Sequence, residues 1–235
     1  KKIAAFGLTE PNAGSDAANV RTRAVREGDS YILDGGKVFI TNGGYSEFAI
    51  VTAKTDKEAG GRGMSAFIVE NSFPGFKMGK TEHKLGIRAS STVEHVFEDM
   101  RVPAENLLGK EGMGFKIAME TLNGGRIGIA SQAVGIAAAA YEDSLRYAKA
   151  RVQFGKPIAD NQAIQWMIAD ISTQLEAARM MCYKAALLQD AGERFSLEAA
   201  QCKLFCSEVS RFCIDRAMQI HGGYGYIGEF SDIEK

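Results

Sequence analysis

The sequence predicts an α+β protein, in which an all-β unit is followed by a bundle of long helices. Short β-branched or alternating runs, separated by glycine-containing turns, fill residues 1 to 108. After Pro103 the apolar residues instead recur every three to four positions, as they do on one face of a helix. We therefore divide the chain into a β-domain, residues 1–108, and a helical domain, residues 109–235.

Seven runs of the first domain are expected to be strands of a small barrel or sandwich. They are Ile3–Phe6, Arg21–Arg26, Tyr31–Leu33, Lys37–Ile40, Ala49–Ala53, Ser65–Val69 and Thr92–Phe97. Asp34-Gly35 is expected to form a hairpin turn, because glycine tolerates the positive backbone angles of a tight turn.

The second domain is expected to begin with a short helix over Phe115–Leu122. Asn123 is then a candidate N-cap for a long helix that runs to about Arg151. Two more long helices are expected, Gln162–Ala191 and Leu197–Ile220, with Trp166 in the core. Three amphipathic helices need a fourth to close an antiparallel bundle, so we expect the four-helix bundle to be incomplete.

Composition is that of an ordinary globular protein and does not favour nucleic acid or membrane as a partner. The 235 residues are 46% hydrophobic and 24% charged, with a formal net charge of −1. No apolar run reaches about 18 residues. Because the chain begins at Lys1, almost inside a strand, we interpret it as part of a longer protein.

Four cysteines lie in the helical half, and three of them share a helix face. Cys202, Cys206 and Cys213 recur at spacings of four and seven, which favours small apolar packing. Zinc is the alternative, although His221 is the only histidine near them in the sequence. Free thiols suit a reducing compartment.

The loop Phe6–Asp16, FGLTEPNAGSD, is the first candidate site. It ends a strand, its glycines allow a ligand to approach the backbone, and Thr9 and Ser15 supply hydroxyls. The structural alternative is a turn whose hydroxyls cap the local backbone.

The sequence supports neither a Rossmann dinucleotide-binding site nor a hydrolase. Gly223–Gly228 matches GxGxxG, but it follows a helix, whereas a dinucleotide fold requires a preceding strand. Gly222 and Gly223 instead predict the end of a helix. His95 alternates with apolar residues and is expected to be packed, and no nucleophile elbow supports hydrolysis.

Four motifs in order resemble those of the acyl-CoA dehydrogenases, nearest to the short-chain, butyryl-type members. They are the Phe6–Asp16 loop, FITNGG at Phe39–Gly44, RVQFGKPIADNQ at Arg151–Gln162 and QIHGGYGY at Gln219–Tyr226. The resemblance covers the whole chain and implies the family's middle β-domain and most of its C-terminal helical domain. The family's N-terminal helical domain would precede Lys1.

This resemblance implies an FAD-dependent enzyme of fatty acid β-oxidation. It would dehydrogenate a short-chain acyl-CoA to the trans-2-enoyl-CoA and pass electrons to an electron-transfer flavoprotein. It would act as a homo-oligomer, a dimer of dimers, in the bacterial cytoplasm or, as the alternative, the mitochondrial matrix. An acyl-CoA oxidase, a flavin monooxygenase and a non-catalytic scaffold with a decayed flavin site remain alternatives.

The resemblance also implies the contacts of each ligand. For FAD they are Phe6, Leu8, Thr9, Gly14, Ser15, Phe39, Ile40, Thr41, Arg151, Phe154, Gln162, Gln219, Ile220, Gly222 and Gly223. For the acyl-CoA they are Ser15, Asn123, Gly124, Gly125 and Arg126. The alternative for Arg151 is a cation that stabilises a helix end.

The catalytic base of the family has no counterpart among these residues. Most members carry a Glu in a segment that would follow Lys235, and a minority carry it at the position of Gly125. Residues 1–235 alone are therefore expected to be inactive. Asn123 stands where the family usually has Asp, which alters any charged contact there.

Overall fold

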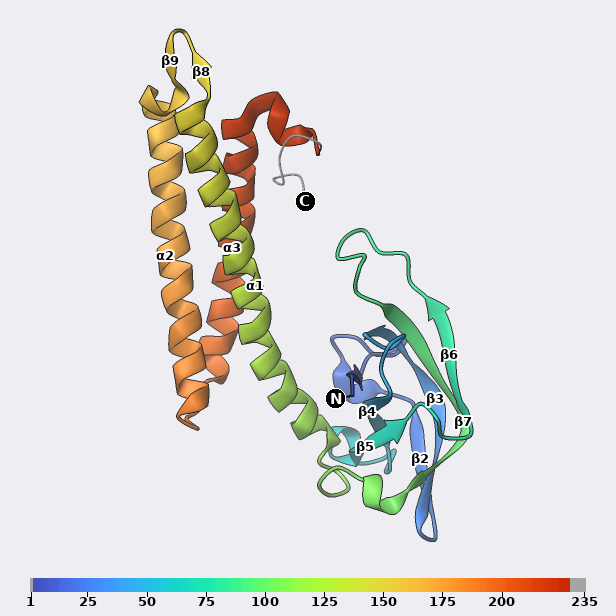
Figure 1. The fold of residues 1–235 in the computed structure, drawn as a ribbon. Helices are drawn as coiled ribbons and strands as arrows, with labels where there is room; N and C mark the ends of the chain where they lie inside the picture. Colours follow the sequence, from blue (N-terminus) through green and yellow to red (C-terminus); the bar gives the residue numbers. More distant parts are fainter. Residues whose placement is uncertain (1, 229–235) are drawn as a thin grey trace. The chain divides into compact units, whose positions relative to one another are not determined.

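The computed structural model describes residues 2–228 (Figure 1). The chain forms two compact units, residues 1–120 and 121–235. The predicted order, a β-sheet followed by long helices, is confirmed. We keep the domain boundary at residue 108 as a proposal.

The first unit is built on one mixed, seven-stranded sheet. Its strands are β1 (Ala4–Gly7), β2 (Arg23–Glu27), β3 (Ser30–Thr41), β4 (Phe48–Lys54), β5 (Met64–Glu70), β6 (Phe76–Thr81) and β7 (Thr92–Pro103). They lie in the order β1-β4-β2-β3-β7-β6, with β5 paired to β4. Leu33, Val51 and Phe67 are fully buried at its core. The 3-10 turns of this unit are η1 (Ala17–Asn19), η2 (Gly60–Gly63) and η3 (Ala104–Asn106).

The predicted hairpin turn at Asp34-Gly35 is wrong, because both residues lie inside β3. The β2–β3 hairpin closes earlier, where Glu27 pairs with Ser30 and Gly28 has a φ of 58°. Gly35 instead occupies a bulge with a φ of 138°. A Cβ at Gly35 would lie 2.8 Å from the Thr22 Cα. Glycine therefore allows both the backbone angle of the bulge and the close approach of β3 to Thr22.

Strand β6 was not predicted. It lies at the end of the sheet order and pairs with β7. Its residues FKMGKT carry two lysines and a glycine, so the apolar alternation is weak. Lysines are common on edge strands because they oppose further pairing, and the same lysines hide such a strand from pattern analysis.

The second unit contains α2 (Gln162–Asp190), α3 (Ser196–His221) and all but the first seven residues of α1 (Gly114–Ala150), which begins in the first unit. Consecutive helices run antiparallel (Figure 1). The predicted break before Asn123 is wrong, because α1 is continuous through it. The Asn123 side-chain amide donates to the Ser196 Oγ of α3 at 3.0 Å, and its Oδ1 accepts from Arg126 one turn further along α1. These two contacts take the side-chain groups that a cap would have used.

Short elements complete this unit at the turns between helices. A hairpin of β8 (Val152–Gln153) and β9 (Lys156–Pro157) and the turn η4 (Ile158–Asp160) join α1 to α2. The turn η5 (Gly222–Tyr226) follows α3. Gly222 has a φ of 61°, in agreement with the predicted helix end. The Rossmann interpretation stays rejected, since the glycines follow α3.

The predicted helix stripes form the core of the second unit. Ile171, Leu175 and Ala178 of α2 and the cysteines of α3 are buried in one cluster. The prediction that Trp166 lies in the core is wrong, because this residue is 62% exposed. Trp166 is two residues from both Ile164 and Ile168, about 200° around the helix, so it lies on the face of α2 opposite the stripe. Among residues 2–228, no helix is long and apolar enough to cross a membrane.

Candidate functional site

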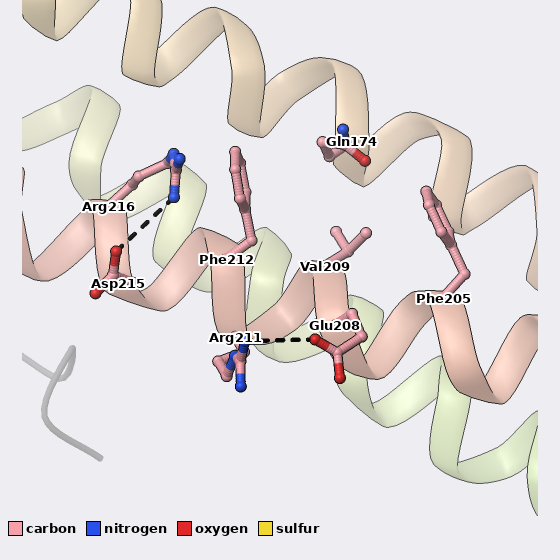
Figure 2. Close-up of a pocket in the computed structure, with 8 residues that line it drawn as sticks. All are labelled: Gln174, Phe205, Glu208, Val209, Arg211, Phe212, Asp215 and Arg216. Atoms are coloured by element: carbon pink, nitrogen blue, oxygen red, sulfur yellow. Dashed lines mark ion pairs between the residues drawn. The ribbon is translucent and has the colours of Figure 1, made fainter.

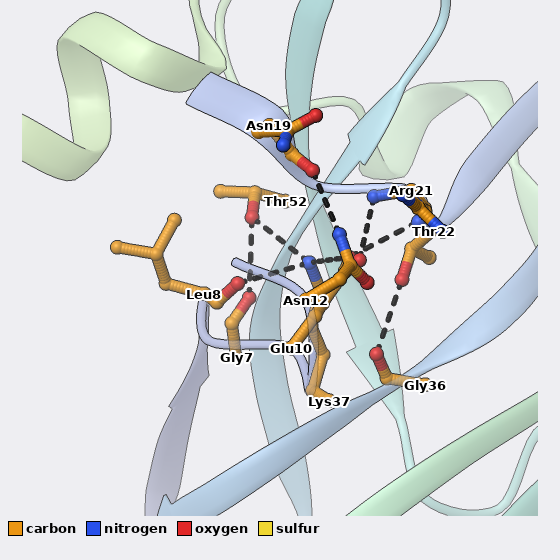
Figure 3. A network of polar contacts seen from close by, with 10 residues as sticks. All are labelled: Gly7, Leu8, Glu10, Asn12, Asn19, Arg21, Thr22, Gly36, Lys37 and Thr52. Carbon is orange, nitrogen blue, oxygen red and sulfur yellow. Dashed lines mark hydrogen bonds and ion pairs between the residues drawn. The ribbon is translucent and has the colours of Figure 1, made fainter. Parts of the chain in front are cut away.

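A buried ion pair anchors the loop that follows β1. The Lys37 Nζ lies 2.7 Å from the Glu10 Oε1, with side-chain exposures of 0% and 3% (Figure 3). The same ammonium donates to the Leu8 carbonyl at 3.2 Å and to the Thr52 Oγ1 at 3.3 Å. The Glu10 carboxylate also accepts hydrogen bonds from the backbone N–H groups of Arg21 and Thr22. One carboxylate thus ties together three segments of chain.

The charges of this pair are set by burial and by mutual attraction. Burial alone would raise the pKa of Glu10, but the Lys37 ammonium and the backbone donors hold that pKa below its usual value. Burial lowers the pKa of Lys37 to about 8, against the opposing attraction of Glu10. Glu10 is therefore an anion fixed inside the fold at neutral pH.

The predicted hydroxyls of this loop are uncommitted. Thr9 is half-buried and Ser15 is exposed, and among the described residues neither hydroxyl hydrogen-bonds to another group of the chain. The loop is held by Glu10 and by the Asn12 amide, which donates to the Asn19 carbonyl at 2.9 Å. A Cβ added at Gly14 would have no atom of residues 2–228 within 4 Å. The structural alternative, hydroxyls that cap the local backbone, does not explain Thr9 and Ser15.

The structure brings the FITNGG segment next to this loop. The Val38 N–H donates to the Thr9 carbonyl at 2.9 Å, which places the end of β3 beside it. Phe39 is 62% exposed with a φ of 59°, a strained backbone for a bulky residue. Strained, exposed residues of this kind concentrate at ligand sites. Thr41 is exposed in the same segment.

Some predicted residues can offer a ligand little except their backbone. Ile40 is 1% exposed in the sheet core, and Leu8 is buried in a small cluster with the half-buried Phe6. Nearby, the buried His95 is packed as predicted, with its Nε2 3.3 Å from the Gly43 carbonyl. Burial lowers the pKa of His95, so its ring is neutral.

A cavity of about 600 Å³ lies beside the same loop in the first unit. Asp16 and Asn19 line it together with three cations, Arg21, Lys54 and Lys57. Sequence analysis missed these cations, because two of them come from β4 and the turn after it. The cavity suits an anionic group.

In the second unit, a cavity of about 500 Å³ collects several predicted residues. Its lining includes Arg151, Ile220, Gly222 and Gly223. Arg151 follows the last residue of α1 and lies over the Tyr224 ring at 5.7 Å. A guanidinium beside exposed glycines can bind phosphate oxygens.

Aromatic residues that were not predicted complete this cavity. His221 stacks on Tyr147 with ring centroids 4.4 Å apart, and its Nδ1 lies 2.8 Å from the Ala217 carbonyl. Both rings line the cavity with Tyr224. The motif QIHGGYGY contained His221 and Tyr224, but nothing local in the sequence pointed to Tyr147.

The other predicted cofactor residues of this unit lie outside the cavity lining. Phe154 and Gly155 form the tip of the β8–β9 hairpin with φ values of 52° and 79°. Phe154 is 100% exposed. Gln162 and Gln219 are exposed as well. A fully exposed aromatic held in a strained turn suits contact with another molecule.

Four of the five predicted substrate residues, Asn123 to Arg126, lie together on one turn of α1, and the fifth, Ser15, lies in the loop after β1. Asn123 and Arg126 are half-buried and bonded to each other. Gly125 is exposed, and a Cβ there would meet nothing within 4 Å. The position can therefore hold a side chain but supplies no group that accepts a proton.

A further cavity of about 550 Å³ contains none of the predicted site residues. It is lined by Gln174 of α2 and by one face of α3, where the Phe205 and Phe212 rings project on either side of Gln174 (Figure 2). Arg216 covers the Phe212 ring at 3.4 Å.

Comparison with known proteins identifies both units. Residues 5–100 match the family model for the acyl-CoA dehydrogenase middle domain, and residues 112–235 match the model for the acyl-CoA dehydrogenase C-terminal domain. The order of the two matches is the order of the two units along the chain.

Individual relatives support the same family assignment. The chain is 52% identical to a short-chain specific acyl-CoA dehydrogenase of Clostridium acetobutylicum, over 98% of this chain and 61% of that protein. It is 50% identical to the subunit CarC of the caffeyl-CoA reductase-Etf complex of Acetobacterium woodii, over 98% of this chain and 61% of that protein.

A solved structure gives the same result. The butyryl-CoA dehydrogenase of Megasphaera elsdenii superimposes with a TM-score of 0.95 at 53% identity, over 98% of this chain and 60% of that one. This chain therefore spans about three fifths of the length of these relatives. With both domain models matched in order, the chain belongs to the acyl-CoA dehydrogenase family.

Proposed function

We propose that the protein containing this chain is an FAD-dependent dehydrogenase of short-chain acyl-CoA thioesters that forms the trans-2-enoyl-CoA. The observation that carries this proposal is the loop after β1. Its backbone is fixed by the buried Glu10–Lys37 pair, while the Thr9 and Ser15 hydroxyls have no hydrogen-bond partner among residues 2–228. A rigid loop with uncommitted donors suits a polar, planar ligand.

FAD fits the groups that are available. Bound FAD would supply two-electron oxidation of the acyl chain. The loop amides and the Thr9 hydroxyl would bond the edge of the isoalloxazine ring, and Phe39 would cover one side of it. We propose that the remaining predicted contacts of the first unit hold this cofactor, with Ile40 and Leu8 acting through their backbone. Those of the second unit are proposed to hold the adenosine diphosphate part of FAD, commonly that of a neighbouring subunit.

We propose that Arg151 binds the diphosphate of FAD. Arg151→Ala should weaken FAD retention by roughly 10- to 150-fold, because a charge-assisted hydrogen bond contributes about 1.5–3 kcal/mol. Equilibrium dialysis of the deflavinated intact protein against FAD measures this. Arg146→Ala is the matched control, since Arg146 is an exposed arginine of α1 paired with Asp143. Equal retention by both variants would assign Arg151 to the helix-end role.

Ser15 and the α1 turn Asn123–Arg126 are proposed to contact the acyl-CoA. Arg126 would offer a cation to the coenzyme, and the three cations of the β-unit cavity give further anion sites. The base that removes the α-proton is proposed to lie beyond residue 235, as in most of the family. Gly125 leaves this helical position without a base.

Activity should show an optimum at short acyl chains, near butyryl-CoA. A pocket that discriminates one methylene contributes about 1–3 kcal/mol, so neighbouring chain lengths should differ by roughly 10- to 200-fold in kcat/KM. Assays of the intact protein with straight and branched acyl-CoAs measure this profile. An optimum at eight or more carbons, or at a branched chain, would contradict it.

The proposed electron acceptor is an electron-transfer flavoprotein, and the proposed assembly is a dimer of dimers. The relative from Acetobacterium belongs to an Etf complex, which supports such a partner. The exposed Phe154 supports a contact with a neighbouring subunit. The bacterial relatives favour the bacterial cytoplasm over the mitochondrial matrix, and the four buried free cysteines suit the reducing conditions of either compartment.

One observation favours a second candidate function. The Acetobacterium relative is named as a subunit of a caffeyl-CoA reductase-Etf complex, and we propose reduction of an enoyl-CoA as the second candidate. Reduction of crotonyl-CoA with reduced electron-transfer flavoprotein, compared with oxidation of butyryl-CoA, distinguishes the two directions. Oxygen consumption during turnover separates both from an oxidase.

The cofactor assignment has its own test. The intact protein is purified and denatured, and its chromophore is identified by chromatography. FAD is expected in the released fraction. Protein that purifies without flavin and cannot be reconstituted with FAD would contradict the proposal and support a scaffold.

A further inference from the structure

Three cysteines of the second unit meet between α2 and α3. Cys182 of α2 lies 3.3 Å from Cys202 and 3.6 Å from Cys206, measured between sulfur atoms. The two cysteines of α3 are 3.9 Å apart. Cys202 and Cys206 are fully buried and Cys182 is 5% exposed. Residues distant in sequence therefore place three sulfurs in one small triangle.

The triangle has the size of a metal or metalloid site. A point equidistant from the three sulfurs lies about 2.1 Å from each, so an ion slightly above their plane reaches the roughly 2.3 Å of a Zn–S bond. Among residues 2–228, these three cysteines are the one set of three or more His, Cys, Asp or Glu side chains whose ligand atoms lie close enough together to hold an ion. It supplies three ligands and no fourth, whereas structural zinc takes four.

The surroundings disfavour a charged complex. The trio belongs to the same buried helical core as Ala178, Ala185 and Ala199, and the Cys206 Sγ donates to the Ala178 carbonyl at 3.4 Å. Three thiolates on Zn²⁺ would leave one net negative charge, and three on Cu⁺ would leave two. An uncompensated buried charge is costly, so the core favours an ion whose three-thiolate complex is neutral.

We propose that Cys182, Cys202 and Cys206 form a three-sulfur binding site for trivalent, three-coordinate thiophilic ions of the arsenite class. In the binding step one As(OH)₃ reacts with three thiols to give As(S–Cys)₃ and three waters. Three S–H and three As–O bonds break, three As–S and three O–H bonds form, and nothing is oxidised or reduced. The product is neutral and needs no fourth ligand, which matches a dry site with three sulfurs.

The test uses the intact, reduced protein incubated with sodium arsenite and then passed through gel filtration. One arsenic per chain should remain bound, and native mass spectrometry should show the gain of one arsenic with loss of three hydrogens. Cys182→Ala, Cys202→Ala and Cys206→Ala should each lower the retained arsenic at least tenfold. Zinc chloride at the same concentration should be retained less than arsenite.

Cys213→Ala is the matched control. Cys213 lies on α3 and is fully buried, but it is not one of the three clustered cysteines. This variant should keep one arsenic per chain, and thermal melting shows whether each variant is folded. Wild-type protein that holds no arsenic, or equal retention by Cys206→Ala and Cys213→Ala, would overturn the proposal. Stronger retention of zinc than of arsenite would overturn the charge argument.

Discussion

Lys37→Met should lower the free energy of unfolding of the β-unit by about 3–5 kcal/mol, the cost of removing one member of a buried ion pair. The substitution keeps an apolar stem but leaves the Glu10 carboxylate buried without its ammonium. The loop carrying Thr9 would also lose the bond from Lys37 to the Leu8 carbonyl. Urea unfolding of the intact protein, followed by the loss of sheet signal, measures the change.

Two comparisons make this result specific. Lys77→Met removes a lysine whose ion pair with Glu98 is more than half exposed, and should change stability by no more than about 1 kcal/mol. Adding Glu10→Met to Lys37→Met should recover part of the loss, because no unpaired charge remains buried. If Lys37→Met and Lys77→Met cost the same, the buried pair does not anchor the loop.

Gly43→Ala should destabilise the same unit and release flavin. An added Cβ would lie 2.6 Å from the Val93 Cγ2 and 2.7 Å from the His95 Nε2. Val93 and His95 are buried, so neither can move away, and overpacking costs about 1–3 kcal/mol. The backbone at residue 43 would then be displaced, and this displacement would also move the preceding residues Phe39–Thr41. Thermal melting with a measured flavin content records both effects.

Gly14→Ala is the matched variant, because it separates packing from ligand approach. Its Cβ would meet no atom of residues 2–228 within 4 Å, so stability should change by less than about 0.5 kcal/mol. Flavin retention should nevertheless fall, because the proposed flavin site places the ligand against this glycine. A Gly43→Ala protein that melts with the wild type and keeps its flavin would show that the segment tolerates displacement.

Local periodicity was enough to predict most of the fold. Ile171, Leu175 and Ala178 recur at helical spacing and are buried, and the strand runs of the first unit became β1 to β5 and β7. Errors arose where a residue's partner is distant in sequence. Gly35 has turn chemistry but is held against Thr22, and Asn123 has cap chemistry but bonds to Ser196.

The candidate site was predictable only in part, for the same reason. Motif order located the loops around Thr9, Phe39 and Arg151. The Glu10–Lys37 pair joins a loop to a strand 27 residues later, and no local pattern links them. The stacking of Tyr147 on His221 likewise depends on the packing of α1 against the end of α3.

The most direct test of the account is anaerobic addition of butyryl-CoA to the intact, purified protein while its flavin absorbance is recorded. The account predicts a flavin spectrum that bleaches on addition of substrate and recovers when electron-transfer flavoprotein is supplied. An intact protein without flavin absorbance, or with a flavin that no acyl-CoA of any chain length bleaches, would contradict it.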